Sequence, residues 1–185
     1  MSLRFAVIGL LRIHEMSGYD LSQVFDHSIR YYWKTEHTQI YRVLSSLADR
    51  GWIEPRIEEQ ESRPDRKVYR VTTEGDAAFR AWREAVLPLP EIRHAHLLQF
   101  SFMSEIPTER IRAFLTSYAA QIRERLALYQ DPDHINQTQQ YARSRRESAI
   151  WRLVLENGVH YYEHELRWCE HALRTLEGES EDDRP

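Results

Sequence analysis

The last part of the chain carries an apolar repeat that limits how the chain can fold. A helical pattern extends from about Ile135 to Leu176, which is longer than an ordinary globular helix. Within it, apolar residues recur at alternating steps of four and three, the heptad pattern of helices that pack lengthwise on a partner. We expect this heptad stripe to hold a homodimer together, or else to pack on the helix predicted over residues 107–129 of the same chain. Its seven positions are Leu155, Val159, Tyr162, Leu166, Cys169, Leu173 and Leu176.

The first part of the chain changes its period from helix to strand. Apolar residues recur at helical spacing in three stretches, residues 2–14, 19–29 and 35–50, and Gly51 stands where a helix-ending glycine is expected. Two short alternating runs, 52–57 and 67–72, then predict strands joined by a charged loop, and a further helix follows over 73–86. This order of elements is typical of a winged helix-turn-helix, with three helices and a two-stranded wing.

Two prolines in the stretch 87–90 mark the best domain boundary, because proline resists helix continuation. We therefore predict a mainly α protein with a winged-helix DNA-binding domain over residues 1–86. Residues 87–177 are predicted to form a helical dimerisation region, with a possible effector site and a long final helix. Residues 178–185 are predicted to be an acidic, disordered tail.

Composition favours a cytoplasmic protein. No stretch approaches the roughly 20 apolar residues that cross a bilayer, and a single cysteine, Cys169, cannot form an internal disulfide. The net charge of -4 does not favour nucleic-acid binding, but charges balance over residues 1–80 and the deficit lies further on. DNA affinity would then depend on where basic side chains are placed.

Several motifs in residues 1–80 resemble the PadR family of transcriptional regulators. They are LRFAVIGLL at 3–11, SGYDL at 17–21, HTQIYRVL at 37–44, RPDRKVY at 63–69 and TTEG at 72–75, and they occur in the family's order. The departures are small: Thr38 stands where serine is common, and Trp52 where leucine is common. The resemblance implies a DNA-binding winged helix, a C-terminal dimerisation region and, in some members, aromatic or planar effectors.

The third helix is the expected recognition helix, because an apolar stripe fixes one side of it and polar side chains occupy the other. Arginine can pair with guanine, glutamine with adenine, and hydroxyl groups with phosphate. Tyr41 is ambiguous, since its ring could pack on the second helix while its hydroxyl reaches a phosphate. In the wing, basic residues are either phosphate contacts or partners of nearby glutamates. The predicted DNA-binding residues are His37, Thr38, Gln39, Tyr41, Arg42, Ser45, Arg63, Arg66 and Lys67.

Nothing in the sequence assembles an active site, so we predict no enzyme, cofactor or metal. The stretch from His160 to His164 matches the H-x-x-E-H pattern of some zinc hydrolases, but the heptad stripe runs through the same helix. His94 and His96 form a second, weak metal pattern. Cys169 lies in the heptad stripe and is expected to be a small buried side chain.

The predicted function is a homodimeric repressor of a pseudo-palindromic operator, released by a small planar aromatic effector bound at the junction of domains or subunits. The alternatives are a winged-helix module that binds protein partners, or a zinc hydrolase built on the H-x-x-E-H stretch. Aromatic side chains in the second half offer flat apolar surface with polar tips, although simple core packing is the alternative. The candidate effector residues are Phe100, Phe102, Tyr118, Trp151, Tyr161 and Trp168.

Overall fold

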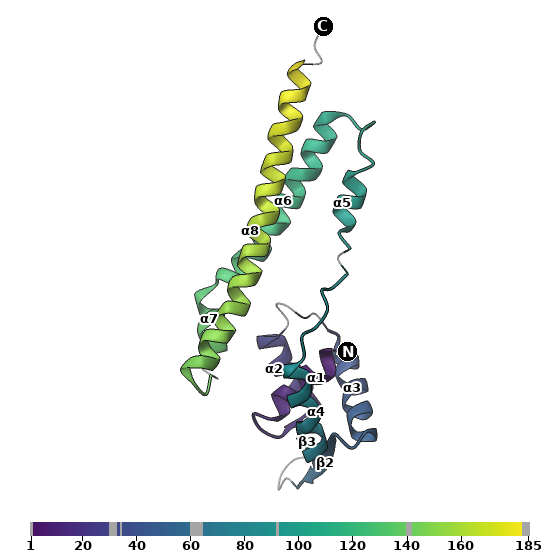
Figure 1. Ribbon diagram of the computed structural model, residues 1–185, viewed down its shortest axis with the longest axis vertical. Helices are drawn as coiled ribbons and strands as arrows, with labels where there is room; N and C mark the ends of the chain where they lie inside the picture. Colours follow the sequence, from purple (N-terminus) through teal and green to yellow (C-terminus); the bar gives the residue numbers. More distant parts are fainter. Residues whose placement is uncertain are drawn as a thin grey trace. The chain divides into compact units, whose positions relative to one another are not determined.

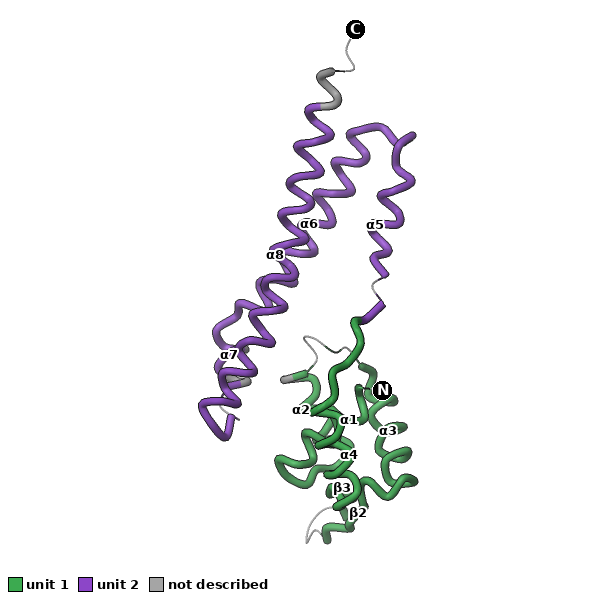
Figure 2. Tube along the Cα trace, in the orientation of Figure 1, with its two compact units in different colours: residues 1–89 green, residues 90–185 purple. Residues whose placement is uncertain are grey.

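The computed structural model divides into two compact units, residues 1–89 and 90–185 (Figure 2). It describes residues 2–29, 33, 35–59, 65–91, 93–139 and 142–182. The expected boundary lay after residue 86, whereas the two units divide after Leu89. Each unit has its own hydrophobic core and is described by itself. In the described part of the chain, no helix combines the length and the apolar character needed to cross a membrane.

The first unit is a winged helix, as predicted (Figure 1). Its sheet has the order β1-β3-β2 with antiparallel pairing, and Ile53 of β2 lies opposite Val71 of β3. The strand β1 was not predicted, because two residues are too few to show an alternating pattern; Met16 pairs with Tyr69. The elements are α1 (Ser2–Leu11), β1 (Met16–Ser17), α2 (Gly18–Ser28), α3 (His37–Asp49), β2 (Ile53–Glu58), β3 (Arg66–Val71) and α4 (Thr73–Glu84).

Local signals explain where the helices of this unit begin and end. Ser17 caps α2 in a capping box, with its side chain accepting from the backbone of Asp20 and the Asp20 side chain accepting from the backbone of Ser17. Gly51 ends α3 in the left-handed conformation, at a φ of 69°. The helix α4 is capped by Thr72, whose side chain accepts a hydrogen bond from the backbone of Gly75. This helix also ends earlier than predicted, at Glu84.

The core of the first unit joins all four helices and the sheet. Apolar side chains of α1 pack against those of α2, α3, β2 and α4, and the Phe5 ring stacks on Trp82 with centroids 4.9 Å apart. This packing fixes the inner side of α3 and leaves its outer side exposed. The buried members are Phe5, Val7, Ile8, Leu10, Leu11, Met16, Leu21, Phe25, Ile40, Leu44, Leu47, Ile53 and Phe79.

The second unit is helical in its described residues, with α5 (Ala95–Phe100), α6 (Thr108–Gln130), α7 (Pro132–Gln139) and α8 (Arg145–Asp182). The prediction of one helix from Ile135 to Leu176 was wrong, because α7 and α8 are separate helices. Ser144 accepts a hydrogen bond from the backbone of Glu147 and so caps the start of α8. The predicted tail begins at residue 178, whereas α8 continues to Asp182, and residues 183–185 lie outside the described residues.

The heptad stripe of α8 faces α6 of the same chain, and the two helices lie side by side (Figure 1). Cys169 is fully buried against Ala119 and Ile122 of α6. Tyr162 and Leu166 pack against the same cluster, and Leu155 is also buried. Packing on the helix of the same chain, one of the two partners that the sequence left open, is therefore observed. Leu155 and Cys169 are buried within the chain, and dimerisation through the heptad stripe stays a prediction.

Gly75 provides a test of the packing between α4 and β2. A Cβ atom at this position would lie 2.0 Å from the backbone oxygen of Trp52, the residue before β2, and a backbone atom cannot move aside as the end of a flexible side chain can. We expect Gly75→Ala to lower the free energy of unfolding by about 1–3 kcal/mol or more, as overpacking does.

The control is Gly178 of α8, because a Cβ atom built there has no other atom within 4 Å. Gly178→Ala should therefore leave stability unchanged or raise it by up to about 1 kcal/mol. Urea unfolding followed by circular dichroism would measure both, and equal effects would contradict this packing.

Candidate functional site

The helix α3 presents a polar face to solvent. Ile40, Leu44 and Leu47 are buried on its inner side. All six side chains predicted on this helix to contact DNA lie on the exposed side: His37, Thr38, Gln39, Tyr41, Arg42 and Ser45. The structure therefore brings these six residues onto one surface, which we call the α3 face.

Two residues at the start of the α3 face already have protein partners. The His37 Nε2 atom lies 2.9 Å from a carboxylate oxygen of Asp26 in α2. The Gln39 side-chain oxygen accepts a hydrogen bond of 2.7 Å from the Thr35 hydroxyl, which leaves the Gln39 amide nitrogen to donate. These contacts hold both side chains at the N-terminal end of the helix, where a recognition helix meets base edges.

Tyr41 is half exposed, and its position answers part of the ambiguity left by the sequence. Its ring lies against Gly18, the first residue of α2, because a Cβ atom there would be 2.4 Å from the ring atom Cε1. The ring therefore packs on the second helix while half of the residue stays exposed. Tyr19, the next residue of α2, is 66% exposed.

Arg42 is the cation of the α3 face. Within the described residues its guanidinium has no carboxylate partner, whereas several other arginines of the unit do, among them Arg56, Arg66 and Arg70. Arg56 pairs with Glu15 at 3.2 Å, and Arg70 pairs with Glu54. An unpaired, exposed guanidinium can bind a base edge or a phosphate without first breaking an ion pair.

The wing differs from its prediction. Arg66 forms an ion pair with Asp20 of α2 and is part-buried. Because Asp20 also accepts from the backbone of Ser17 at 2.9 Å, Arg66 links the base of the wing to the cap of α2. Arg66 would have to break this ion pair before it could make the DNA phosphate contact that the sequence predicted. Lys67 is exposed, with its ammonium group 5.5 Å from the centre of the Tyr69 ring. Arg63 lies outside the described residues.

In the second unit, three of the six candidate effector residues come together around His96. The imidazole of His96 stacks on the Tyr118 ring with centroids 4.3 Å apart, and it lies edge-on to Trp168 at 5.9 Å. Phe100 is edge-on to the same tryptophan at 5.4 Å. We call His96, Phe100, Tyr118 and Trp168 the aromatic cluster.

The other three candidates do not join the aromatic cluster. Phe102 is 77% exposed. Trp151 precedes Trp168 on α8 by 17 positions, which places it about 25 Å along the helix. Tyr161 is nearly half exposed and packs edge-on against Tyr162, with centroids 5.1 Å apart.

Glu165 is a buried carboxylate beside the aromatic cluster, and the sequence did not single it out. Its Oε2 atom accepts a hydrogen bond of 3.1 Å from the Tyr118 hydroxyl and lies 3.2 Å from Nε2 of His96. Burial lowers the pKa of His96, although Glu165 alone would raise it. Burial, and then the negative charge of Glu165, raise the pKa of Tyr118 far above its usual value. The phenol therefore stays protonated and remains a hydrogen-bond donor.

The H-x-x-E-H stretch does not form a metal-binding group. His160 lies on an exposed part of α8, and its Nδ1 atom is 3.5 Å from Glu163. Among the described residues, the group of three potential ligands that lie close together is instead His94, His96 and Glu165.

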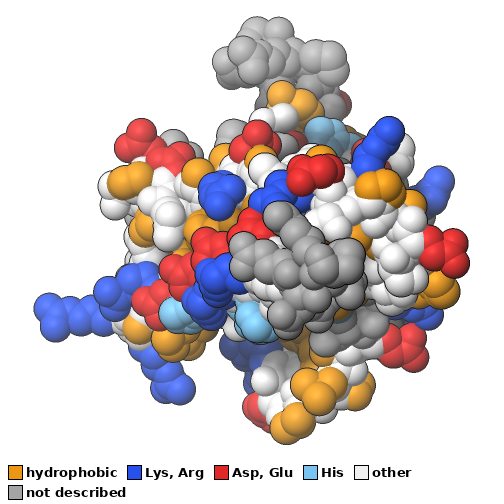
Figure 3. Space-filling view, turned by 90° about the horizontal axis from the view of Figure 1, so that it is seen from above, with side chains coloured by type: hydrophobic (Ala, Val, Ile, Leu, Met, Phe, Trp, Pro, Cys, Tyr) orange, Lys and Arg blue, Asp and Glu red, His pale blue; other side chains and the backbone are white. Residues whose placement is uncertain are grey.

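Charge on the surface is mixed. On the face seen in Figure 3, basic and acidic side chains are interspersed, with hydrophobic side chains between them. The net charge of -4 belongs to the whole chain, whereas Arg42 on the α3 face and Lys67 in the wing are exposed cations.

The fold and the exposed α3 face define a winged-helix protein of the nucleic-acid-binding class. Residues 7–81 match the "Transcriptional regulator PadR-like family", and residues 92–177 match the "Virulence activator alpha C-term" family. Over residues 7–81 the chain is therefore similar to the PadR-like family of transcriptional regulators.

Two curated relatives match parts of the chain. The negative transcriptional regulator PadR of Bacillus subtilis is 34% identical over 103 residues, 55% of this chain and 57% of the relative. A probable transcriptional regulator of Mycobacterium tuberculosis is 38% identical over 82 residues, 44% of this chain and 43% of the relative. The matched stretches thus span about half the length of each relative.

Solved structures of Bacillus subtilis PadR resemble the chain over nearly its whole length. The complex with operator DNA has a TM-score of 0.81 at 25% identity and covers 95% of this chain and 99% of the other. The complex with p-coumaric acid has a TM-score of 0.79 at 25% identity and covers 96% and 99%.

Proposed function

We propose that the protein is a repressor that binds operator DNA through its α3 face and wing. The observation that carries this proposal is the α3 face itself, where polar side chains surround an unpaired Arg42 on a helix fixed from behind by its buried stripe. The structure of Bacillus subtilis PadR with operator DNA supports it, because that protein shares this fold at 25% identity. Operator binding requires access to the chromosome, so we place the protein in the cytoplasm.

The contacts divide into two kinds. Arg42 and Gln39 carry donors that suit base edges, and we assign them to sequence readout. The hydroxyl groups of Thr38, Tyr41 and Ser45, together with the ammonium group of Lys67, suit phosphate oxygens and set the affinity. Arg66 is assigned to holding the wing against α2, since Asp20 already takes its charge.

A pair of substitutions separates these two roles. Arg42→Ala should weaken binding to the DNA just upstream of the protein's own gene by about 10-fold or more and reduce discrimination against unrelated DNA, because it removes a base contact. Lys67→Ala should weaken all sequences alike and lower the slope of the salt dependence by about 1. Mobility shift and fluorescence anisotropy at several salt concentrations would measure both effects.

Arg110→Ala is the matched control, because it removes an exposed charge from α6 in the other unit. It should leave operator affinity unchanged. Folded Arg42→Ala and Lys67→Ala proteins with full operator affinity would disprove the assigned contact surface. A wild-type protein that binds no DNA but captures a protein partner would favour the alternative function, a protein-interaction module.

We further propose that the protein is a homodimer, joined by a face of α8 other than the heptad stripe. Ile150, Leu153, Val154 and Tyr161 recur at helical spacing and are 50%, 63%, 39% and 45% exposed. They lie on one side of the helix, roughly 120° around its axis from the heptad stripe. An apolar stripe of this kind on a soluble protein marks an interface, and a two-fold dimer would bring two recognition helices to a pseudo-palindromic operator.

Light scattering tests this interface. The wild-type protein at micromolar concentration should have twice the mass of the 22.2 kDa chain. Leu153→Glu places a charge in the middle of the exposed stripe and should yield the monomer mass. Leu89→Glu, which changes an exposed leucine outside the helices, should remain dimeric. A monomeric wild type, or a dimer that Leu153→Glu leaves intact, would show that this face is not the interface.

The third part of the proposal is an inducer of planar aromatic chemistry, bound beside the aromatic cluster. The structure of Bacillus subtilis PadR with p-coumaric acid supports this class of ligand. The rings offer flat apolar contact, and Glu165 can accept a hydrogen bond from a phenolic hydroxyl group. A carboxylate on the ligand must then lie away from Glu165, because like charges repel.

A fluorescence titration tests the inducer site. Binding of p-coumaric acid or a related phenolic acid should quench Trp168, and the Trp168→Phe protein should lose most of that signal. The control variant Trp151→Phe should keep it, because this tryptophan lies about 25 Å away on α8. Operator affinity should fall at least tenfold with the ligand, which corresponds to a coupling of about 1.4 kcal/mol. Ligands that quench Trp168 and leave operator affinity unchanged would show binding without control.

A regulatory role is favoured over an enzymatic one. The curated relatives are transcriptional regulators. The H-x-x-E-H stretch that motivated the hydrolase alternative lies on the exposed side of α8, and His160 is paired with Glu163. A zinc hydrolase would need a third protein ligand there.

A further inference from the structure

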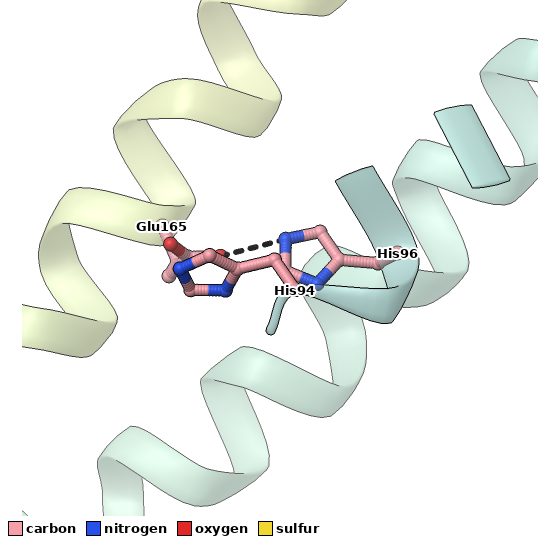
Figure 4. A group of neighbouring side chains, drawn as sticks. All are labelled: His94, His96 and Glu165. Atoms are coloured by element: carbon pink, nitrogen blue, oxygen red, sulfur yellow. Dashed lines mark ion pairs between the residues drawn. The ribbon is translucent and has the colours of Figure 1, made fainter. Parts of the chain in front are cut away.

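Three potential metal ligands meet in the second unit, from two segments far apart in the sequence (Figure 4). His94 and His96 lie at the start of α5, and Glu165 projects from α8. In Figure 4 both imidazoles point toward the carboxylate, and the dashed line marks the 3.2 Å ion pair between His96 and Glu165. The ligand atoms of all three side chains lie within 4.8 Å of one another.

The spacing of these atoms is close to what a metal ion requires. A tetrahedral Zn²⁺ with bonds of about 2.0–2.2 Å holds its ligand atoms roughly 3.3 Å apart. The His96–Glu165 separation already matches this value. His94 needs a small side-chain rotation, and it is free to make one: it stands at the N-cap of α5 without a capping hydrogen bond.

The neighbouring Tyr118 leaves the metal-binding atoms available. Its hydroxyl oxygen lies 3.1 and 3.2 Å from the two ring nitrogens of His96. Because these distances are nearly equal and the two rings are stacked, the hydroxyl lies over the imidazole face and not along either nitrogen lone pair. On Glu165, both contacts use Oε2, and within the described residues Oε1 accepts no hydrogen bond.

We propose that His94, His96 and Glu165 bind a divalent transition-metal ion of the Zn²⁺, Co²⁺ or Ni²⁺ class. Two imidazoles and one carboxylate suit these ions, whereas Mg²⁺ and Ca²⁺ prefer oxygen ligands alone. Three protein ligands leave one position of a tetrahedral ion for water or for another ligand. The hydrogen bond from Tyr118 to Glu165 orients the carboxylate, as outer partners do at metal sites.

The ion would also cross-link the start of α5 to α8. Metal that binds the folded protein and not the unfolded chain raises the melting temperature. The proposal does not depend on the regulatory role, so operator binding and metal binding can succeed or fail separately.

The experiment uses the full-length protein, freed of metal with a chelator, and ZnCl₂ alone as the probe. Isothermal titration should give one Zn²⁺ per chain, and the melting temperature should rise by several degrees. CoCl₂ should give the visible absorption of a tetrahedral ion. His94→Ala should weaken Zn²⁺ binding at least tenfold, and Glu165→Gln should reduce it further.

His160→Ala is the matched control, because His160 belongs to the exposed histidines of α8 and should not affect binding. His94 is half-buried and has no capping bond, so His94→Ala keeps the test valid if Glu165→Gln fails to fold. Circular dichroism would check the fold of each variant. The proposal is overturned if the wild type binds no Zn²⁺, if His94→Ala binds as well as the wild type, or if His160→Ala removes the binding.

Discussion

The packing of α8 on α6 is the constraint on which the second unit depends. A helix of 38 residues is stable in water only when its apolar side is covered, and the heptad stripe gives it such a side. Cys169 is buried against Ala119 and Ile122, and these three side chains form the core between the two helices. Once this side is packed on α6, the rotation of α8 about its own axis is fixed, and so is the direction in which each of its other side chains points. Glu165 then faces Tyr118 of α6, and the exposed stripe around Leu153 faces away.

Much of the winged helix could be predicted from the sequence, because its signals are local. The periods of helix and strand, the glycine at position 51 and the polar side of α3 are each set by a few neighbouring residues. The strand β1 was missed because Met16 and Ser17 are strand only through pairing with β3, a distant segment. The break before α8 did have a local signal, since Ser144 and Glu147 have the spacing of a capping box, but it was read as part of one helix.

The candidate sites were harder to predict, because ion pairs join residues that are remote in sequence. Arg66 was expected to contact phosphate, since nothing near it in the sequence shows that Asp20 of α2 is its partner. His94 and His96 gave a weak metal pattern alone, and nothing in the sequence linked them to Glu165, which lies about 70 residues further on. For the heptad stripe, the pattern was clear but the partner was not. Its pattern requires a partner helix but does not distinguish one in the same chain from one in another.

The ion pair between Arg66 and Asp20 has a consequence for how this protein would respond to salt. Binding to DNA releases condensed counterions in proportion to the phosphates that protein cations neutralise. An arginine whose charge is already balanced inside the protein releases few of them. The count of basic residues near the wing therefore overstates the number of counterions displaced. The affinity for DNA should therefore fall less steeply with rising ionic strength than that count suggests. A larger part of the binding free energy should come from shape complementarity and from contacts with the bases.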